Sequence, residues 1–313
     1  MSDDEALREC RRDDGAILRY QDSGPRDGSA PALLILDGIG CSGWAFKKII
    51  PGLATERRVL RPHYRGHGRS PDPPRPWRLS MEVLADDAAA VCDHAGVRRV
   101  IAVGFSMGFQ VALELLRRHR PRVSGLCSLA GPSGRVLQSF QGTDVFGHAL
   151  PLVRALTRIA RDLSARAWRR LVPSRWTTQI GLATQLNADR LAAADFEFYT
   201  RQLAEVNPEL FVAMLEEADR HSAADLLPSI DVPALIVAGA RDTFVPLPTM
   251  RALAFAIPRV RWEVIAAATH ALPAEFPAEI EATLRRFAAE VDAAEIEAAR
   301  GSAAAGGSSG GRG

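Results

Sequence analysis

A short turn motif between an apolar run and a helix-favouring segment constrains the fold of this chain more than any other feature. Residues 100–105 read Val-Ile-Ala-Val-Gly-Phe, a run that predicts a buried strand. Ser106-Met107-Gly108 follows, and a helix-favouring segment covers 110–118. Glycines at 104 and 108 permit a sharp, closely packed turn that exposes the serine oxygen beside the first free N–H groups of the helix. The stretch therefore predicts a nucleophile elbow. The alternative is an ordinary strand-to-helix turn whose serine is merely small.

Composition and charge exclude several classes of protein. The chain has 313 residues, of which 47% are hydrophobic, so it can bury a large core. Its formal charge of +2 gives no indication of a nucleic-acid partner. No apolar run is long enough to predict a membrane span, and residues 1–14 lack the apolar core of a secretory signal. The four cysteines lack metal-ligand spacing and are typical of reduced thiols, so we expect a cytoplasmic protein.

Strand and helix patterns alternate along most of the chain. An amphipathic helix is predicted over 80–95, and a final helix over about 274–291. Short connections between alternating strands and helices are typical of an α/β protein with a doubly wound, mostly parallel sheet. The runs that predict strands lie at residues 15–21, 31–36, 57–63, 100–105, 123–130, 233–239 and 261–265.

A segment with helical periodicity only interrupts this alternation. We predict a helical cap at 132–227, inserted between two parts of an α/β core at 1–131 and 228–292, and a disordered tail at 293–313. The first part of the cap holds seven arginines against one acid, and its later part holds nine acids against three arginines. We expect these basic and acidic helices to face each other; a basic helix on a membrane or on an anionic substrate is the alternative. We expect most of six aromatic residues to form the cap core, and one or two of them to line a pocket: Trp168, Trp176, Phe196, Phe198, Tyr199 and Phe211.

Five motifs occur in an order that resembles the α/β-hydrolase fold. The resemblance covers about residues 15–291 and implies a mostly parallel, eight-stranded, doubly wound sheet with the helical cap inserted after the sixth strand. It also implies that the backbone N–H groups of Ile39 and Met107 form an oxyanion hole. The motifs are Asp-Gly-Ile-Gly at 37–40, Tyr-Arg-Gly-His-Gly-Arg-Ser at 64–70, Gly-Phe-Ser-Met-Gly at 104–108, Gly-Ala-Arg-Asp-Thr-Phe-Val-Pro at 239–246 and Thr-His-Ala-Leu-Pro at 269–273.

The chemistry of serine requires two further residues. A serine hydroxyl is a poor nucleophile near neutral pH, so Ser106 needs a base, and the base needs a third group to fix its tautomer. Of the seven histidines, His270 alone follows both the elbow and a terminal strand; His67 and His221 are the weaker alternatives. The family order of nucleophile, acid and histidine points to Asp242 as the acid.

The assignment of the acid has two alternatives. Asp242 ends a predicted strand, and such an aspartate can instead cap its own turn. Some relatives take the acid from the loop after the sixth strand, where the first acid of this chain is Asp144.

We therefore predict a serine hydrolase, without metal or cofactor, that cleaves a carboxylic ester or a related small acyl compound through an acyl-enzyme. The same triad serves carbon–carbon bond hydrolysis, perhydrolysis and acyl transfer, so these remain alternatives. A non-catalytic small-molecule binding protein of the same fold is a further alternative. Ser106 disfavours haloalkane dehalogenase and epoxide hydrolase chemistry, since those members of the fold use aspartate at that position. The sequence determines neither the substrate nor the oligomeric state.

Asp37 departs from the His-Gly that this fold usually carries at the end of the third strand. An unpaired carboxylate about 8 Å from an oxyanion would oppose it by roughly 2 kcal/mol at an effective dielectric near 20. We therefore expect Asp37 to pair with a cation from the loop after the fourth strand, Arg65 first and His67 second. On this hypothesis Asp37→Asn destabilises the fold, because it leaves a buried guanidinium without its partner.

Overall fold

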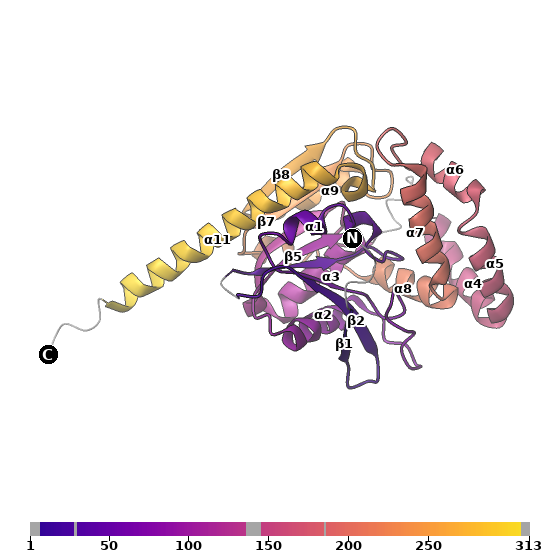
Figure 1. Ribbon diagram of the computed structural model, residues 1–313, viewed down its shortest axis with the longest axis horizontal. Coiled ribbons are helices and arrows are strands. Elements are labelled where there is room, and N and C mark those ends of the chain that lie inside the picture. Colours follow the sequence, from indigo (N-terminus) through magenta and orange to yellow (C-terminus); the bar gives the residue numbers. More distant parts are fainter. Residues whose placement is uncertain (1–6, 28–29, 136–144, 185, 308–313) are drawn as a thin grey trace.

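The computed structural model describes residues 7–27, 30–135, 145–184 and 186–307 (Figure 1). In these residues eight strands form one sheet in the order β1-β2-β4-β3-β5-β6-β7-β8. The pairs β1–β2 and β2–β4 are antiparallel and the other five are parallel, which confirms the predicted fold class. The strands are β1 (Arg8–Arg11), β2 (Ile17–Ser23), β3 (Ala32–Leu36), β4 (Val59–Pro62), β5 (Val100–Phe105), β6 (Val123–Leu129), β7 (Ala234–Gly239) and β8 (Val260–Ile265).

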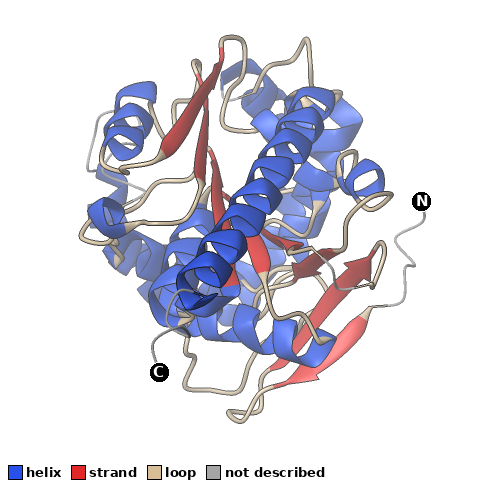
Figure 2. Ribbon diagram, turned by 90° about the vertical axis from the view of Figure 1, so that its left-hand side faces the viewer, coloured by secondary structure: helices blue, strands red, loops and turns tan. Residues whose placement is uncertain are grey.

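The central strands are apolar throughout because helices cover both faces of the sheet (Figure 2). Alternate residues of β3 divide between two core clusters: Leu34 and Leu36 belong to one, and Leu33 and Ile35 to the other. The first cluster includes residues of α2 (Met81–Ala95), α3 (Met107–Arg118) and α9 (Leu247–Phe255). The second includes residues of α1 (Ile50–Leu53) and α11 (Pro277–Gly307).

The two ends of the chain differ from the sequence-based expectation. The strand β1 was not expected, because its sequence Arg-Glu-Cys-Arg carries charge and only Cys10 is buried. The predicted disordered tail at 293–313 is wrong for 293–307, which continue α11 as one helix, and 308–313 lie outside the described residues. Alanine- and glutamate-rich sequence favours helix there, and Glu295 anchors it by an ion pair with Arg99. Figure 1 shows α11 projecting beyond the body of the molecule.

In the described part of the chain between β6 and β7, the α-helices are α4 (Val145–Ile159), α5 (Arg161–Leu171), α6 (Arg175–Thr184), α7 (Ala193–Glu205) and α8 (Pro208–Arg220). Figure 1 shows α4, α5 and α6 at the outer edge of this insertion. The ring of Trp168 packs 5.3 Å from that of Phe211, and Phe196 packs 5.7 Å from Tyr199. Trp176, expected in the cap core, is instead 64% exposed.

The basic and acidic helices of the insertion pair only in part. Arg154 binds Glu216 at 2.5 Å and Arg161 approaches Glu209 at 3.3 Å. Four other arginines, Arg166, Arg169, Arg170 and Arg175, make no hydrogen bond or ion pair with the described residues. The expectation that the basic and acidic helices face each other therefore holds for part of their surface only. In the described part of the chain, no helix is both long and apolar enough to cross a membrane.

Candidate active site

Ser106 lies on a strained turn between β5 and α3. Its backbone has a φ of 52° and a ψ of −125°, which residues with a side chain rarely adopt. Close packing requires both glycines of the motif. A Cβ at position 104 would lie 2.4 Å from Cα of Phe109, and a Cβ at Gly108 would lie 2.0 Å from the carbonyl oxygen of Leu36. This turn places the serine at the edge of the sheet where the parallel strands end.

Gly108→Ala is expected to destabilise the fold by about 3 kcal/mol, because the added methyl group would meet a carbonyl oxygen of a buried strand. Gly96→Ala is the matched control. Gly96 has a φ of 69°, but apart from its chain neighbours no described residue lies within 4 Å of its added Cβ, so we expect only a conformational cost of about 1 kcal/mol. Urea denaturation measures both losses, and equal losses would contradict the packing argument.

His270 and Asp242 reach the serine from loops that follow β8 and β7. Nε2 of His270 lies 2.9 Å from Oγ of Ser106, and its Nδ1 lies 2.9 Å from Oδ2 of Asp242. The carboxyl ends of parallel strands meet at one edge of a sheet, which explains how residues so distant in sequence come together. The three residues that the motifs singled out thus form one continuous hydrogen-bonded chain, the arrangement that general-base activation of a serine requires.

The carboxylate of Asp242 is fixed by its own loop. Its Oδ1 accepts the N–H groups of Phe244 at 2.8 Å and Val245 at 2.9 Å, and its side chain is 1% exposed. The other oxygen is thereby directed toward His270. The turn-capping interpretation and the catalytic interpretation of Asp242 are therefore compatible, since each uses a different oxygen. Asp144, the alternative acid, lies outside the described residues.

Two residues that the sequence reasoning missed hold the histidine loop. The ring of Phe244 packs 5.0 Å from that of His270. The buried carboxylate of Glu275 accepts hydrogen bonds from the N–H of Thr269 at 2.9 Å and from its hydroxyl at 2.6 Å. It also accepts the N–H of Asn187 at 2.8 Å, so it ties this loop to the insertion. A single acid near a helix start carries no signal that would have identified it.

The loop after β3 packs directly against the nucleophile. A Cβ at Gly38 would lie 3.2 Å from Cβ of Ser106, which is closer than most such contacts in proteins. Among the described residues, neither the N–H of Ile39 nor that of Met107 has a hydrogen-bond acceptor. Two unpaired amides on segments that flank the serine can bind a negative oxygen.

Residues of the insertion cover this loop. A Cβ at Gly40 would lie 2.6 Å from Leu203 and 3.0 Å from Phe211, and the Tyr199 hydroxyl would be 3.6 Å away. The ring of Tyr199 also packs 4.8 Å from that of Trp44. The surroundings of the loop beside Ser106 are therefore largely apolar and aromatic.

The expected partner of Asp37 is wrong. Oδ2 of Asp37 lies 3.5 Å from Nη1 of Arg61 on β4, and neither Arg65 nor His67 binds it. Arg65 is held instead by Asp87, at 2.5 and 2.7 Å, and by Asp14. Arg61 is available because Gly43 leaves room for its guanidinium, which occupies the position of an added Cβ. Burial raises the pKa of Asp37, and the Arg61 charge and the Gly43 N–H only partly oppose this rise.

Asp37→Asn is now expected to leave the protein at least as stable as the wild type at neutral pH. Because the pKa of Asp37 is raised, the folded protein binds a proton at this carboxyl group more tightly than the unfolded chain does. This proton binding stabilises the fold at low pH, and the stabilisation is lost as the pH rises through the pKa of Asp37. Asparagine does not ionise, so the stability of the variant does not fall with rising pH at this position. Gln21 still binds Arg61 at 2.7 Å. Melting temperatures from about pH 4 to about pH 8 measure the effect.

Asp22→Asn is the contrasting control for this measurement. Burial alone would raise the pKa of Asp22, but ion pairs with Arg58 and Arg8 hold it below its usual range. Its contribution to stability is present at neutral pH and is lost as the pH falls, so this variant should melt lower at neutral pH. If Asp22→Asn and Asp37→Asn lower the melting temperature equally at neutral pH, the direction that we assign to the pKa shift of Asp37 is contradicted.

The alternative bases lie in other environments. Nδ1 of His67 is 3.0 Å from the carbonyl oxygen of Arg65, and burial lowers the pKa of His67. Nε2 of His221 lies 2.9 Å from Oε1 of Glu114. His221, Glu114 and Glu82 form the one group of three potential metal ligands found in the described part of the chain. Arg117 also binds the Glu114 carboxylate, at 3.2 Å, so the group is already an ion-pair network.

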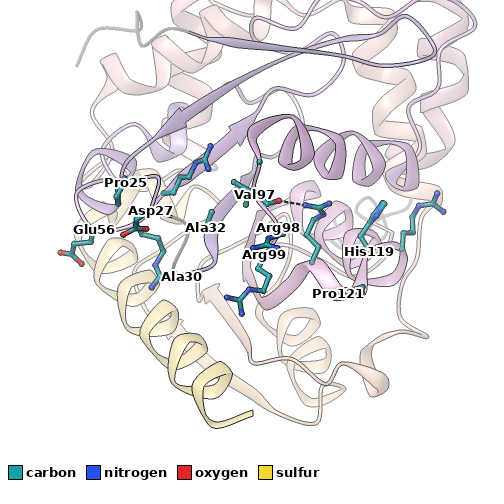
Figure 3. Close-up of a pocket in the computed structure, with 15 residues that line it drawn as sticks. Pro25, Asp27, Ala30, Ala32, Glu56, Val97, Arg98, Arg99, His119 and Pro121 are labelled. Carbon is teal, nitrogen blue, oxygen red and sulfur yellow. Dashed lines mark hydrogen bonds between the residues drawn. The ribbon is translucent and has the colours of Figure 1, made fainter. Parts of the chain in front are cut away.

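A cavity of about 880 Å³ lies at the opposite edge of the sheet from the serine (Figure 3). Ala32, at the start of β3, and Arg99, just before β5, line it. Most of its arginines already form ion pairs with acids. It therefore has no part in the chemistry around Ser106.

Comparison with known proteins decides the family. The model of the alpha/beta hydrolase fold family matches residues 31–277. The chain belongs to the alpha/beta hydrolase fold family. The matched segment contains Ser106, Asp242 and His270, and the resemblance inferred from the five motifs is confirmed.

Relatives of this alpha/beta hydrolase chain carry several names. It is 32% identical to the magnesium-chelatase 30 kDa subunit of Rhodobacter capsulatus, over 72% of this chain and 75% of that protein. It is 29% identical to the 2-hydroxymuconate semialdehyde hydrolase of Pseudomonas sp. (strain CF600), over 82% of this chain and 85% of that protein. Among solved structures, a thermophilic esterase from Thermogutta terrifontis matches with a TM-score of 0.72 and 26% identity, over 91% of this chain and 98% of that chain. The family and these relatives support hydrolase activity in general.

Proposed function

We propose that the protein is a serine hydrolase that cleaves a carboxylic ester, or a related acyl compound, of a small molecule. The observation that carries this proposal is the position of His270, whose two ring nitrogens lie 2.9 Å from Oγ of Ser106 and from Oδ2 of Asp242. The similarity to an esterase with a TM-score of 0.72 supports an ester as the substrate class.

The proposed mechanism assigns one role to each of the three residues. Oγ of Ser106 attacks the substrate carbonyl carbon while Nε2 of His270 takes its proton. The buried carboxylate of Asp242 holds the Nδ1–H of the ring and stabilises the imidazolium that forms. The same proton then passes from Nε2 to the departing alcohol, which leaves an acyl group on the serine. A water molecule, deprotonated by His270, hydrolyses this acyl-enzyme and restores the hydroxyl.

Backbone N–H groups stabilise the charge that develops on the carbonyl oxygen. We assign this role to Ile39 and Met107, whose N–H groups have no acceptor among the described residues. One such donor contributes a rate factor on the order of 10²–10³ in related chemistry. The apolar residues over the loop, Tyr199, Leu203 and Phe211, would contact the substrate, so we expect acyl groups with apolar chains to be preferred.

A panel of p-nitrophenyl esters from acetate to octanoate tests this function. We expect saturable turnover that depends on chain length and that Ser106→Ala abolishes. No turnover of any ester by a folded protein would contradict an esterase of this substrate class.

A role as a subunit without catalysis is the second candidate, because one relative, 32% identical, is named as a magnesium-chelatase subunit. The two candidates differ in what they require of the serine. A hydrolase loses its function with Ser106→Ala, whereas a binding subunit keeps its partner and its stability.

A further inference from the structure

The outer helices of the insertion expose an unusual number of large apolar side chains. Leu152, Leu156 and Ile159 have the i, i+4, i+7 spacing of one helix face on α4. On α5, where no residue is buried, Leu163 and Leu171 lie on one face. We call these five residues and Trp176 the outer face. Their exposed fractions are 64% for Leu152, 57% for Leu156, 83% for Ile159, 70% for Leu163, 64% for Leu171 and 64% for Trp176.

The outer face is not the side by which α5 attaches to the insertion. Nε1 of Trp168 donates to the carbonyl oxygen of Leu203 on α7 at 2.9 Å, and its ring packs on Phe211. These contacts fix the inner side of α5. Proteins seldom expose several large apolar side chains on neighbouring helices, as α4 and α5 do, without a binding partner.

Arginines that make no ion pair with the described residues lie on the same helices, α5 and α6, as Leu163, Leu171 and Trp176. Arg166 and Arg170 lie on the same face of α5 as Leu163, and all three are exposed. Arg169 and Arg175 are also exposed and, like the first two, make no ion pair with the described residues. Asp162 is the one acid in the described segment 152–179. A partner for this surface must therefore offer negative charge together with apolar groups.

We propose that the outer face docks on the surface of an anionic lipid bilayer. Helices with an apolar face bordered by arginines lie in the plane of the membrane interface, with the apolar side chains among the acyl chains and the guanidinium groups at the headgroup phosphates. A second copy of the chain is a poor partner, because it would bring the same arginines together. Docking needs no membrane-spanning helix.

Docking would place the candidate active site near lipid. The insertion that carries the outer face also covers the loop beside Ser106, through Leu203 and Phe211. Given the proposed function, acyl substrates dissolved in the bilayer would then reach the serine more readily than substrates in water. The docking itself does not depend on turnover, so it is tested without any substrate.

Sedimentation with vesicles tests the proposal. We expect the full chain to bind vesicles of phosphatidylcholine and phosphatidylglycerol, and to bind more weakly in high salt and to phosphatidylcholine alone. The double variant Arg166→Gln/Arg170→Gln should lower the partition coefficient about 25-fold, since each basic residue contributes about fivefold. Leu156→Ser/Ile159→Ser should lower it at least about tenfold.

Matched controls distinguish binding through the outer face from nonspecific adsorption to vesicles. Phe255→Ser removes an apolar side chain that is 72% exposed on α9, and Arg98→Gln removes an exposed arginine that makes no ion pair with the described residues; neither should change binding. Three outcomes would overturn the proposal. They are a wild-type protein that does not sediment with anionic vesicles, equal binding by the outer-face and control variants, and a dimer that Leu156→Ser/Ile159→Ser dissociates. Vesicle binding without esterase activity would contradict the proposed function and leave the docking standing.

Discussion

Ser106→Ala is expected to lower kcat for a responsive ester by about 10⁴-fold or more while leaving the melting temperature nearly unchanged. The substitution removes the covalent path, because among the described residues Ser106 alone has a hydroxyl within hydrogen-bond distance of Nε2 of His270. It removes little packing, since a single oxygen is lost from a side chain that is only partly buried. Steady-state kinetics and a thermal melt measure the two effects.

Ser229→Ala is the matched control for the loss of a hydroxyl. Ser229 is exposed, and its Oγ donates to the carbonyl oxygen of Leu226 in the same turn. Its variant should keep full activity. If Ser106→Ala keeps more than about a tenth of the wild-type kcat, another group is the nucleophile.

Asp242→Asn is expected to lower kcat by about 10⁴-fold, because the amide would favour the wrong tautomer of His270. Its fold should survive, since the asparagine oxygen can still accept the N–H groups of Phe244 and Val245. Asp144→Asn is the comparison, because it removes the acid that the alternative assignment would use. A larger loss from Asp144→Asn than from Asp242→Asn would move the catalytic acid to the loop after β6.

The sequence predicted the parts of the site that short local patterns determine. Gly104 is required by a contact of 2.4 Å with Phe109 inside the strand-turn-helix unit, and Gly108 by a contact of 2.0 Å with Leu36 on the adjacent strand β3, so the pentapeptide pattern follows from packing in its immediate surroundings. The order of Ser106, Asp242 and His270 along the chain, each after a predicted strand, was sufficient to choose them from many similar residues. The parallel sheet then brings their loops to one edge.

Contacts between distant segments could not be predicted in the same way. Arg65 was the expected partner of Asp37, but Asp14 and Asp87 bind Arg65, and Arg61 of β4 lies beside Asp37 instead. The role of Glu275 likewise depends on Asn187, from the insertion.

The first strand, the last helix and the insertion show what hydrophobic pattern and composition do not predict. The charged strand β1 gave no apolar pattern, because only one of its side chains is buried. The helix α11 continues past the last core residue, Val291, since alanine and glutamate favour helix without packing. The pairing of the charges in the insertion depends on which helix faces are in contact, and composition does not contain that information.

Labelling with a fluorophosphonate probe tests the central claim most directly, because the probe reacts with a serine that a neighbouring base activates. We expect one phosphonate adduct per chain, located on Ser106 by peptide mapping, formed faster by the wild type than by Asp242→Asn and absent from Ser106→Ala. No adduct on the folded wild-type protein, or an adduct on a serine other than Ser106, would contradict the proposal that this chain is a serine hydrolase with Ser106 as its nucleophile.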